Sequence, residues 1–153
     1  MGPDGTDASP RGDADVVVRV VDAQTLWLPD WKGNNRLDSL RNIVRDGRLS
    51  LMFMVPGSDT VVRINGKAAV TADPQIVEHF NREGKTPCTV TVIGVREVYF
   101  QCAKALMRSR LWHGDDESAG LPTAGQFLQE QAPEFDGSTY DNGYPQYAKE
   151  RLW

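Results

Sequence analysis

Short runs of β-branched and apolar residues, many of them bounded by turn signals, recur along the first 101 residues and limit what this chain can fold into. The runs lie at residues 16–21, 25–28, 51–55, 60–64, 67–71 and 89–95. Pro56-Gly57-Ser58-Asp59 is a turn signal between two of them, and Asn65-Gly66 marks a turn or a bulge. Short runs at this spacing are typical of antiparallel strands. The pattern predicts a mainly β fold, a small barrel of about six antiparallel strands with short helices.

Two helices are expected between the strands. Asn34-Asn35 can cap a helix whose apolar residues recur at helical spacing until Asp46-Gly47. Asp73-Pro74 has the residue types of an N-cap and a first helical position. A helix is therefore predicted over residues 74–81.

The sequence changes character after Trp112. Residues 1–112 carry 15 Lys and Arg against 13 Asp and Glu, a balance of +2, whereas residues 113–153 carry 2 against 8, a balance of −6. We expect a barrel domain over the first part. In the second part, residues 123–131 are expected to form a short helix and the rest an extended arm. Its aromatic residues are Phe135, Tyr140, Tyr144, Tyr147 and Trp153. Because disordered tails are poorer in aromatic residues, this acidic C-terminal extension is expected to pack on the barrel or on a partner subunit.

Charge, cysteines and histidines argue against several classes of protein. The net charge of −4 at pH 7 disfavours nucleic acid as a partner, because phosphate binding usually needs a basic surface. Cys88 and Cys102 are not at metal-ligand spacing and indicate two free thiols in a reducing, cytoplasmic compartment. With two histidines, His79 and His113, no metal site is expected. No apolar run approaches the roughly 20 residues of a membrane helix, and the N-terminus lacks a secretory signal pattern.

Two segments have residue types that bind anions. In Ser9-Pro10-Arg11-Gly12-Asp13, backbone N–H groups can approach a planar ligand, and Arg11 can hold a phosphate or a carboxylate. The alternative is an ordinary Pro-Gly turn with an exposed arginine. Gly33-Asn34-Asn35-Arg36 precedes a helix, and a helix N-terminus with a nearby arginine attracts anions. Simple capping by asparagine is the alternative there.

A third segment, residues 104–112, combines three cations, a hydroxyl and a tryptophan. If it is helical, Lys104 and Arg108 share a face, and an anion between them would relieve their repulsion. A solvated basic face is the alternative. No arrangement of Ser, Cys, His and Asp indicates a catalytic group, so catalytic residues are not assigned. An enzyme with so few acid–base groups would depend on a cofactor.

Four segments, in this order, resemble the pyridoxamine 5'-phosphate oxidase-related flavoproteins of the FMN-binding split-barrel superfamily. They are SPRGD, LPDWKGNNRLDSLRNI, PGSDTVVRINGKA and VYFQCAKALMRSRLW. The resemblance implies a six-stranded antiparallel Greek-key split barrel over residues 1–112. It also implies a homodimer, FMN in clefts at the subunit interface, and a small-molecule substrate.

The resemblance also implies roles for single residues. Arg11, Asn35 and Arg36 would meet the FMN phosphate. The backbone of Gly12 and Asp13, after Ser9, would lie beside the flavin ring. The remaining site residues that the resemblance implies are Pro29 and Asp30 on the neighbouring strand, and Lys104, Arg108, Ser109 and Trp112 from the opposite subunit or on the substrate side.

Two departures from the family pattern matter. Relatives begin with a helix and a strand before the turn that is Pro3-Asp4-Gly5-Thr6 here, so an N-terminal element is expected to be missing and one sheet edge unpaired. The basic stretch ends at Trp112 and turns acidic, so vitamin B6 is not carried over as the substrate. The resemblance implies an FMN-dependent oxidoreductase with an undefined substrate. The alternatives are a non-catalytic flavin-binding protein, or a relative that binds a deazaflavin or haem in the same cleft.

Overall fold

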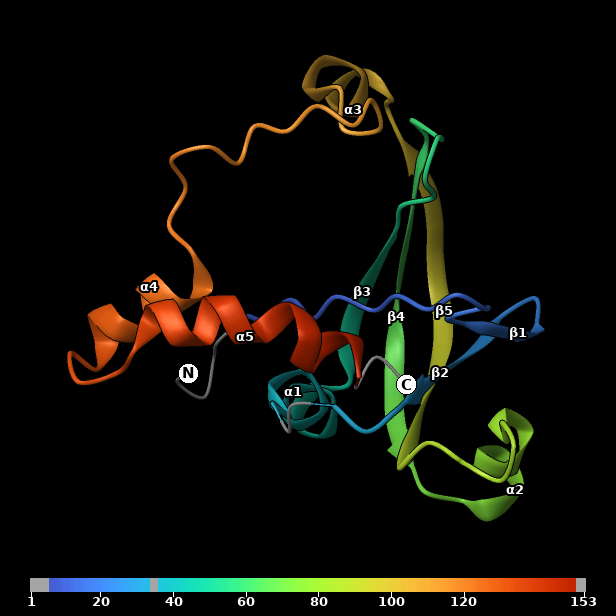
Figure 1. Ribbon diagram of the computed structural model, residues 1–153. Helices are drawn as coiled ribbons and strands as arrows, with labels where there is room; N and C mark the ends of the chain where they lie inside the picture. The colour runs from blue at the N-terminus through green and yellow to red at the C-terminus, as the bar shows by residue number, and fades with distance from the viewer. Residues whose placement is uncertain (1–5, 34–35, 151–153) are drawn as a thin grey trace. The chain divides into compact units, whose positions relative to one another are not determined.

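The structure is a computed structural model that describes residues 6–33 and 36–150 (Figure 1). The predicted cap and site residue at Asn34-Asn35, the first residues of the N-terminal turn at 3–5 and the aromatic residue Trp153 lie outside the described residues. The chain divides into two compact units, Met1–Trp112 and His113–Trp153, and each is considered by itself.

The first unit is an antiparallel sheet with short helices between its strands. Its strands are β1 (Arg19–Asp22), β2 (Thr25–Asp30), β3 (Arg48–Phe53), β4 (Val61–Thr71) and β5 (Thr89–Gln101). Its helices are α1 (Asp38–Asp46), α2 (Pro74–Val77), the 3-10 helix η1 (Glu78–Phe80) and α3 (Lys104–Ser109). The strand order is β1-β2-β5-β4-β3, and every neighbouring pair is antiparallel. The mainly β prediction is confirmed, with five strands rather than six in the described part of the chain.

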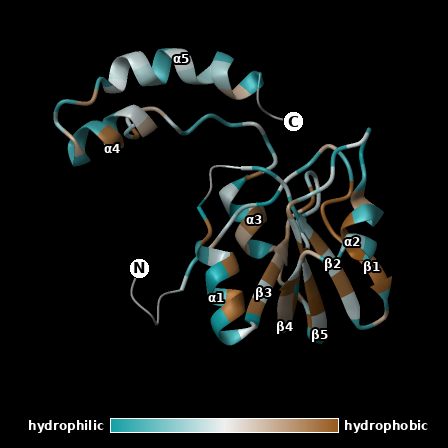
Figure 2. Cartoon of the chain, turned by 90° about the horizontal axis from the view of Figure 1, so that it is seen from below, coloured by the Kyte–Doolittle hydropathy of each residue, from teal (hydrophilic) through white to brown (hydrophobic). Residues whose placement is uncertain are grey.

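The core lies where β5 runs between β2 and β4. Val90 and Ile93 of β5 are fully buried, and Leu26 of β2 is nearly so. Leu26 lies opposite Ile93, which lies opposite Ala68, so these three residues share one face of the sheet. Apolar residues follow these strands in Figure 2. This buried centre of the sheet supports the chain segments at its rim.

The predicted runs at 60–64 and 67–71 form a single strand, β4. Asn65-Gly66 between them is a bulge rather than a turn, since the register against β5 shifts there. A Cβ on Gly66 would lie 2.5 Å from the carbonyl oxygen of Gly94. Glycine therefore allows the close approach of β4 and β5 at the bulge.

Several predicted boundaries are moved. The run at 16–21 is a strand only from Arg19 onward. Helix α1 begins at Asp38, and its N-cap makes no side-chain hydrogen bond. The cap at Asp73 is confirmed, because its carboxylate accepts a hydrogen bond from the Gln75 backbone N–H at 2.9 Å. The helix predicted over residues 74–81 is α2 followed by η1.

The second unit consists of α4 (Ala124–Gln131) and α5 (Gly137–Lys149), which lie side by side (Figure 2). The prediction of a helix near residues 123–131 is confirmed, and Thr123 is its N-cap. The prediction of an extended arm is wrong, because α5 is helical over 13 residues. Asp136 caps α5 by accepting from the Thr139 backbone N–H at 3.0 Å.

Contacts with α4 stabilise α5 against its own glycines and proline. The carboxylate of Asp141 on α5 accepts hydrogen bonds from the Gly125 backbone N–H at 2.8 Å and from the Thr123 hydroxyl at 2.5 Å. A Cβ on Gly125 would lie 2.2 Å from the carbonyl oxygen of Gly137. The two helices therefore cross closely at a pair of glycines.

Three findings concern the helices, the thiols and the metal-ligand types of the described residues. None of the helices that the structure describes has the length and apolar character needed to cross a membrane. The thiols of Cys88 and Cys102 are free, as expected, and the structure shows that they are exposed. Residues 6–33 and 36–150 contain no group of three or more His, Cys, Asp or Glu residues that could hold a metal ion.

Candidate functional site

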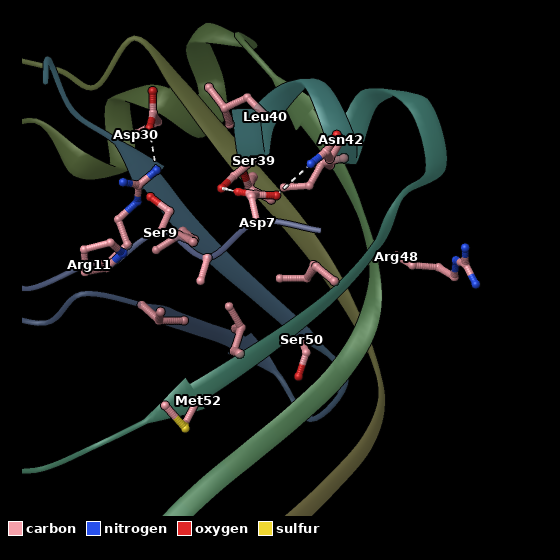
Figure 3. Close-up of a pocket in the computed structure, with 18 of the residues that line it drawn as sticks. Asp7, Ser9, Arg11, Asp30, Ser39, Leu40, Asn42, Arg48, Ser50 and Met52 are labelled. Atoms are coloured by element: carbon pink, nitrogen blue, oxygen red, sulfur yellow. Dashed lines mark hydrogen bonds and ion pairs between the residues drawn. The ribbon is translucent and has the colours of Figure 1, made fainter. Parts of the chain in front are cut away.

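A cleft of about 1120 Å³ opens between the N-terminal segment, β2, α1 and β3 (Figure 3). Residues 6–11 form one side, and the end of β2 and the inner face of α1 form the next. Residues of β3 form the remaining side of the cleft. β3 is an edge strand, since it pairs only with β4 in the described part of the chain. Thr91, which is 2% exposed, also lines the cleft. This volume is sufficient for a cofactor-sized ligand, because ligand pockets measure about 300–1,000 Å³.

Residues 6–11 are fastened to α1 through Asp7. The Ser39 hydroxyl donates a short hydrogen bond to Asp7 Oδ2, and Asn42 Nδ2 donates one to Asp7 Oδ1 at 2.7 Å. These side-chain bonds, first from Ser39 and then from Asn42, hold the pKa of Asp7 below its ordinary value despite partial burial. Ser39 and Asn42 are three residues apart and share one helix face. We call the hydrogen bonds of Asp7 with Ser39 and Asn42 the Asp7 latch. This latch fixes one side of the cleft.

Arg11 lies beside the carboxylate of Asp30 in the same cleft. Arg11 Nη2 donates to Asp30 Oδ1 at 3.2 Å. The Arg11 side chain remains 38% exposed, against 20% for Asp30. The guanidinium has five N–H donors, and this ion pair uses one of them. Arg11 therefore has donors left for a ligand anion while Asp30 restrains its position.

The far rim of the cleft is formed by the end of α1 and the start of β3. Arg48 makes three hydrogen bonds with the Asp46 carboxylate, at 2.6 to 3.0 Å. The hydrogen bonds from Arg48 hold the pKa of Asp46 below its ordinary value. Arg45 also lines this rim and has no ion pair among the described residues. The polar part of the lining therefore combines arginines with aspartates, while β3 adds apolar side chains such as Leu51 and Phe53.

Four of the residues singled out from the sequence line this one cleft. They are Ser9, Arg11, Pro29 and Asp30. Gly12 and Asp13 follow Arg11 but do not line the cleft, and a Cβ on Gly12 would meet nothing within 4 Å. The Asp13 carboxylate is instead paired with Arg82 at 2.6 Å. Sequence reasoning missed Asp7, Ser39 and Asn42, although the helical spacing of Ser39 and Asn42 indicates a shared face.

Of the other singled-out residues, those that the structure describes do not line the cleft. Arg36 is exposed and pairs with Asp38 at 2.9 Å. Asn35 lies outside the described residues. Lys104, Arg108 and Ser109 are exposed on α3. The indole N–H of Trp112 donates to the backbone oxygen of Ser58 at 2.8 Å.

Helix α3 borders a second, apolar pocket of about 330 Å³. This pocket shares Met52 and Met54 with the main cleft. Ala105 and Leu106 contribute the α3 side of it. The segment after β5 is therefore next to the wall that β3 gives to the main cleft.

The fold and cleft define a class of protein, a mainly β antiparallel domain with a cofactor-sized cleft lined by an Arg-containing N-terminal segment. Residues 1–102 match the family model described as Pyridoxamine 5'-phosphate oxidase. The chain belongs to that family, and the resemblance seen in its four segments is confirmed.

Solved structures to which the chain has some similarity include two of HupZ from Group A Streptococcus and one from Listeria innocua. The first, of a HupZ variant, has 18% identity and a TM-score of 0.46, and covers 56% of this chain and 73% of its own. The second HupZ structure has 16% identity and a TM-score of 0.46, with 55% and 68% covered. The Listeria protein, described as a candidate pyridoxamine 5'-phosphate oxidase, has 22% identity and a TM-score of 0.37, with 53% and 71% covered. No curated protein matches the chain.

Proposed function

We propose that this chain is an FMN-dependent oxidoreductase of the pyridoxamine 5'-phosphate oxidase-like superfamily that acts on a small-molecule substrate. The observation that carries the proposal is the position of Arg11 in a cofactor-sized cleft, with donors free for an anion. Membership of the family supports the choice of a flavin as the ligand. The residue types of the lining fit the three parts of FMN.

Each part of FMN has a complement in the cleft. Arg11 and the Ser9 hydroxyl suit the phosphate, since guanidinium groups bind phosphate through paired N–H donors. Leu51 and Phe53 supply an apolar wall for the flavin ring. The nearly buried hydroxyl of Thr91 suits the polar ribityl chain.

The protein's part in the reaction is binding and orientation. When bound, FMN supplies the redox chemistry, the transfer of a hydride from a donor to an acceptor. Arg11 would hold the phosphate, Asp30 would restrain Arg11, and the Asp7 latch would keep residues 6–11 over the cleft. In the described part of the chain, no histidine or cysteine lines the cleft. We therefore assign no acid–base step to the chain.

Arg11 variants test the cofactor proposal. Arg11→Ala should weaken FMN about ten- to hundredfold, because a charge-assisted hydrogen bond contributes about 1.5–3 kcal/mol. Riboflavin lacks the phosphate, so its affinity should change much less. Titration of both ligands by flavin fluorescence measures the difference. Arg41→Gln, on the exposed side of α1, is the matched control. Equal losses for FMN and riboflavin would contradict the role of Arg11.

The residues just before α1 and those in or just after α3 that the family resemblance implies for the site also remain part of this proposal. They are Asn35, Arg36, Lys104, Arg108, Ser109 and Trp112. The pocket beside α3 supports the idea, because it shares two methionines with the wall of the main cleft. Trp112→Phe tests it, since a tryptophan near a flavin loses fluorescence when FMN binds. Unchanged quenching in this variant would remove the α3 segment from the site.

A non-catalytic flavin-binding protein is the second candidate. In the described cleft, each of the carboxylates of Asp7, Asp30 and Asp46 is already engaged by a neighbouring side chain, and this favours it over an enzyme that needs a free proton donor. The two differ in one measurement, the reduction of bound FMN by added NADH or NADPH and its reoxidation by oxygen. Turnover supports the oxidoreductase, and a bound flavin that no donor reduces supports the second candidate.

We also propose that the protein is a homodimer, and an exposed apolar strip supports a second copy as the partner. The strip consists of two rows across β3, β4 and β5, which the strand register puts on one face. The rows are Phe53, Val62 and Phe100, and Leu51, Ile64 and Val98. Phe100 is 76% exposed and Val98 is 59% exposed. Val62 is also exposed, and the other three residues are half-buried. Contiguous apolar surface that reaches solvent is typical of interfaces.

Continuity with the cleft favours a second copy over another partner. Leu51 and Phe53, at one end of the two rows, also line the cleft. A copy seated on the strip would add a wall to the proposed cofactor site, as the implied interfacial FMN requires. The strip holds no charged residue, so it matches itself about a two-fold axis. The acidic extension over residues 113–153 is proposed to pack on the barrel or on this second copy, and the cytoplasmic location remains a prediction.

A further inference from the structure

The segment that carries Arg11 is held by a second ion pair, which no sequence argument indicated. Arg82 Nη1 donates to Asp13 Oδ2 at 2.6 Å, and the Asp13 side chain is only 10% exposed. The guanidinium carbon of Arg82 lies 4.9 Å from the ring centre of Trp31. Arg82 therefore contacts both a carboxylate and an aromatic ring. Asp13 lies two residues after Arg11, so two neighbouring ion pairs hold the segment, one from Arg11 to Asp30 of β2 and one from Asp13 to Arg82.

Arg82 itself is fixed by a tight turn. Its backbone N–H and carbonyl both pair with Lys85, at 2.9 Å each. Glu83 and Gly84 between them have φ angles of 52° and 82°. Positive φ at both central residues is the geometry of the two-residue hairpin turn. The Gly84 backbone N–H also donates to the Asn81 side chain at 2.8 Å. The backbone at the base of the Arg82 side chain is thereby fixed within this turn.

Asp13 is an anion beside Arg82. Burial raises the pKa of Asp13, but the hydrogen bond and charge of Arg82, with the backbone N–H groups of Ala14 and Asp15, leave that pKa below its ordinary value. Asp13 is therefore anionic at neutral pH. An unpaired carboxylate two residues from Arg11 would repel a phosphate and compete for the Arg11 guanidinium.

We propose that Arg82 is a positioning residue for the proposed FMN site, which neutralises Asp13 and fixes it so that Arg11 stays available to the phosphate. The inference rests on the proposed function, since it takes the phosphate of FMN as the anion. It assigns a role to the turn at residues 82–85, which lies outside the cleft. Arg82 touches no ligand in this account and acts through Asp13.

The first test compares ligands with and without a phosphate. Arg82→Gln should weaken FMN about tenfold, as expected when a charged hydrogen bond is lost, and riboflavin much less. Arg82→Lys keeps the charge and should restore most of the FMN affinity. Arg41→Gln removes an exposed cation from α1 and should change neither ligand. Equal losses of FMN and riboflavin in Arg82→Gln would overturn the proposal, because they indicate a merely structural role.

The second test removes the carboxylate as well as its partner. If the unpaired charge of Asp13 is what harms binding, the double variant Asp13→Asn/Arg82→Gln should bind FMN more tightly than Arg82→Gln alone. A structural role predicts the opposite, since the double variant then loses both ends of the link. Binding by the double variant that is equal to or weaker than that of Arg82→Gln overturns the proposal.

A cofactor-free readout separates this inference from the proposed function. Trypsin cuts after Arg11 when the segment is loose, and the fragment that begins at Gly12 reports the cut by mass. Arg82→Gln should release this fragment faster than the wild type or Arg41→Gln. If the wild type binds no FMN, the proposed function fails while the cleavage rates still test the Arg82 link. Unchanged cleavage in Arg82→Gln overturns the link itself.

Discussion

At the scale of single residues, the cleft depends on side chains that restrain the N-terminal segment rather than on acid–base groups. Asp7 ties this segment to Ser39 and Asn42 of α1. Arg11 and Asp13, further along the segment, each pair with an opposite charge. A mobile stretch without regular secondary structure would not hold an arginine in place. These links therefore turn the segment into a wall of the cleft.

The Asp7 latch gives a pH-dependent prediction. Asp7→Asn should lower the free energy of unfolding at pH 7 by about 1–2 kcal/mol, because Ser39 and Asn42 each lose a charged acceptor. The pKa of Asp7 is lower in the folded state, so its stabilisation is present above the ordinary carboxyl pKa and disappears as the pH falls through the lowered one. Urea unfolding of wild type and variant should therefore differ at pH 7 and converge below about pH 4.

A matched carboxylate serves as the control for the latch. Asp59→Asn changes a side chain for which no hydrogen bond or ion pair occurs among the described residues. Its unfolding free energy should stay within about 0.5 kcal/mol of the wild type at pH 7. A difference between Asp7→Asn and the wild type that persists unchanged at low pH would contradict the latch.

At the scale of secondary-structure elements, the pair α4 and α5 depends on glycines at its crossing. Gly125→Ala should destabilise the pair by about 1–3 kcal/mol, because the new Cβ would lie 2.2 Å from a backbone oxygen of Gly137. Gly143→Ala is the matched change within α5, since its Cβ would meet nothing within 4 Å. It should leave stability unchanged or raise it by about 0.5–1 kcal/mol through helix propensity. Thermal melting followed by circular dichroism compares the two, and equal effects would contradict the close crossing.

The strands were predictable because their information is local. β-Branched runs and the turn at Pro56-Gly57-Ser58-Asp59 are read directly from neighbouring residues. Helix α5 was not predictable, because Gly143 and Pro145 disfavour a helix on their own. Its stability comes from the Asp136 cap and from contacts with α4, which lies earlier in the chain. In α5, tertiary contacts therefore outweigh the low helix propensity of these residues.

The candidate site, too, was predictable from the sequence only in part. The sequence singled out Ser9, Arg11, Pro29 and Asp30, and the structure brings these four together around one cleft. The Asp7 contacts with Ser39 and Asn42 span 32 and 35 residues, and the Asp13 contact with Arg82 spans 69. Pairings at such separations leave no periodic pattern in a single sequence. These pairings depend on the three-dimensional arrangement of the sheet and α1, which a single sequence does not give.

At the scale of the whole molecule, the apolar strip predicts the oligomeric state. Light scattering at micromolar concentration should give about twice the chain mass of 17.0 kDa. Phe100→Glu places a charge in the strip and should shift the protein to the monomer, because an unpaired charge in an apolar interface is costly. FMN affinity should fall with it, if the second copy completes the cleft.

The control for this prediction introduces the same charge elsewhere. Val44 is 74% exposed on α1 and lies outside the strip, so Val44→Glu should remain dimeric. A wild type that is monomeric while it binds FMN fully would contradict the interfacial site. A Phe100→Glu variant that stays dimeric would contradict the strip as the interface.

The central claim is that this chain binds FMN through its phosphate in the cleft beside Arg11. The most direct measurement is the absorbance spectrum of the purified protein before and after FMN is added, with riboflavin titrated in parallel. The account predicts a perturbed flavin spectrum, saturable binding of FMN, and weaker binding of riboflavin. A spectrum that FMN leaves unperturbed, or a haem or deazaflavin band in the purified protein, would contradict it.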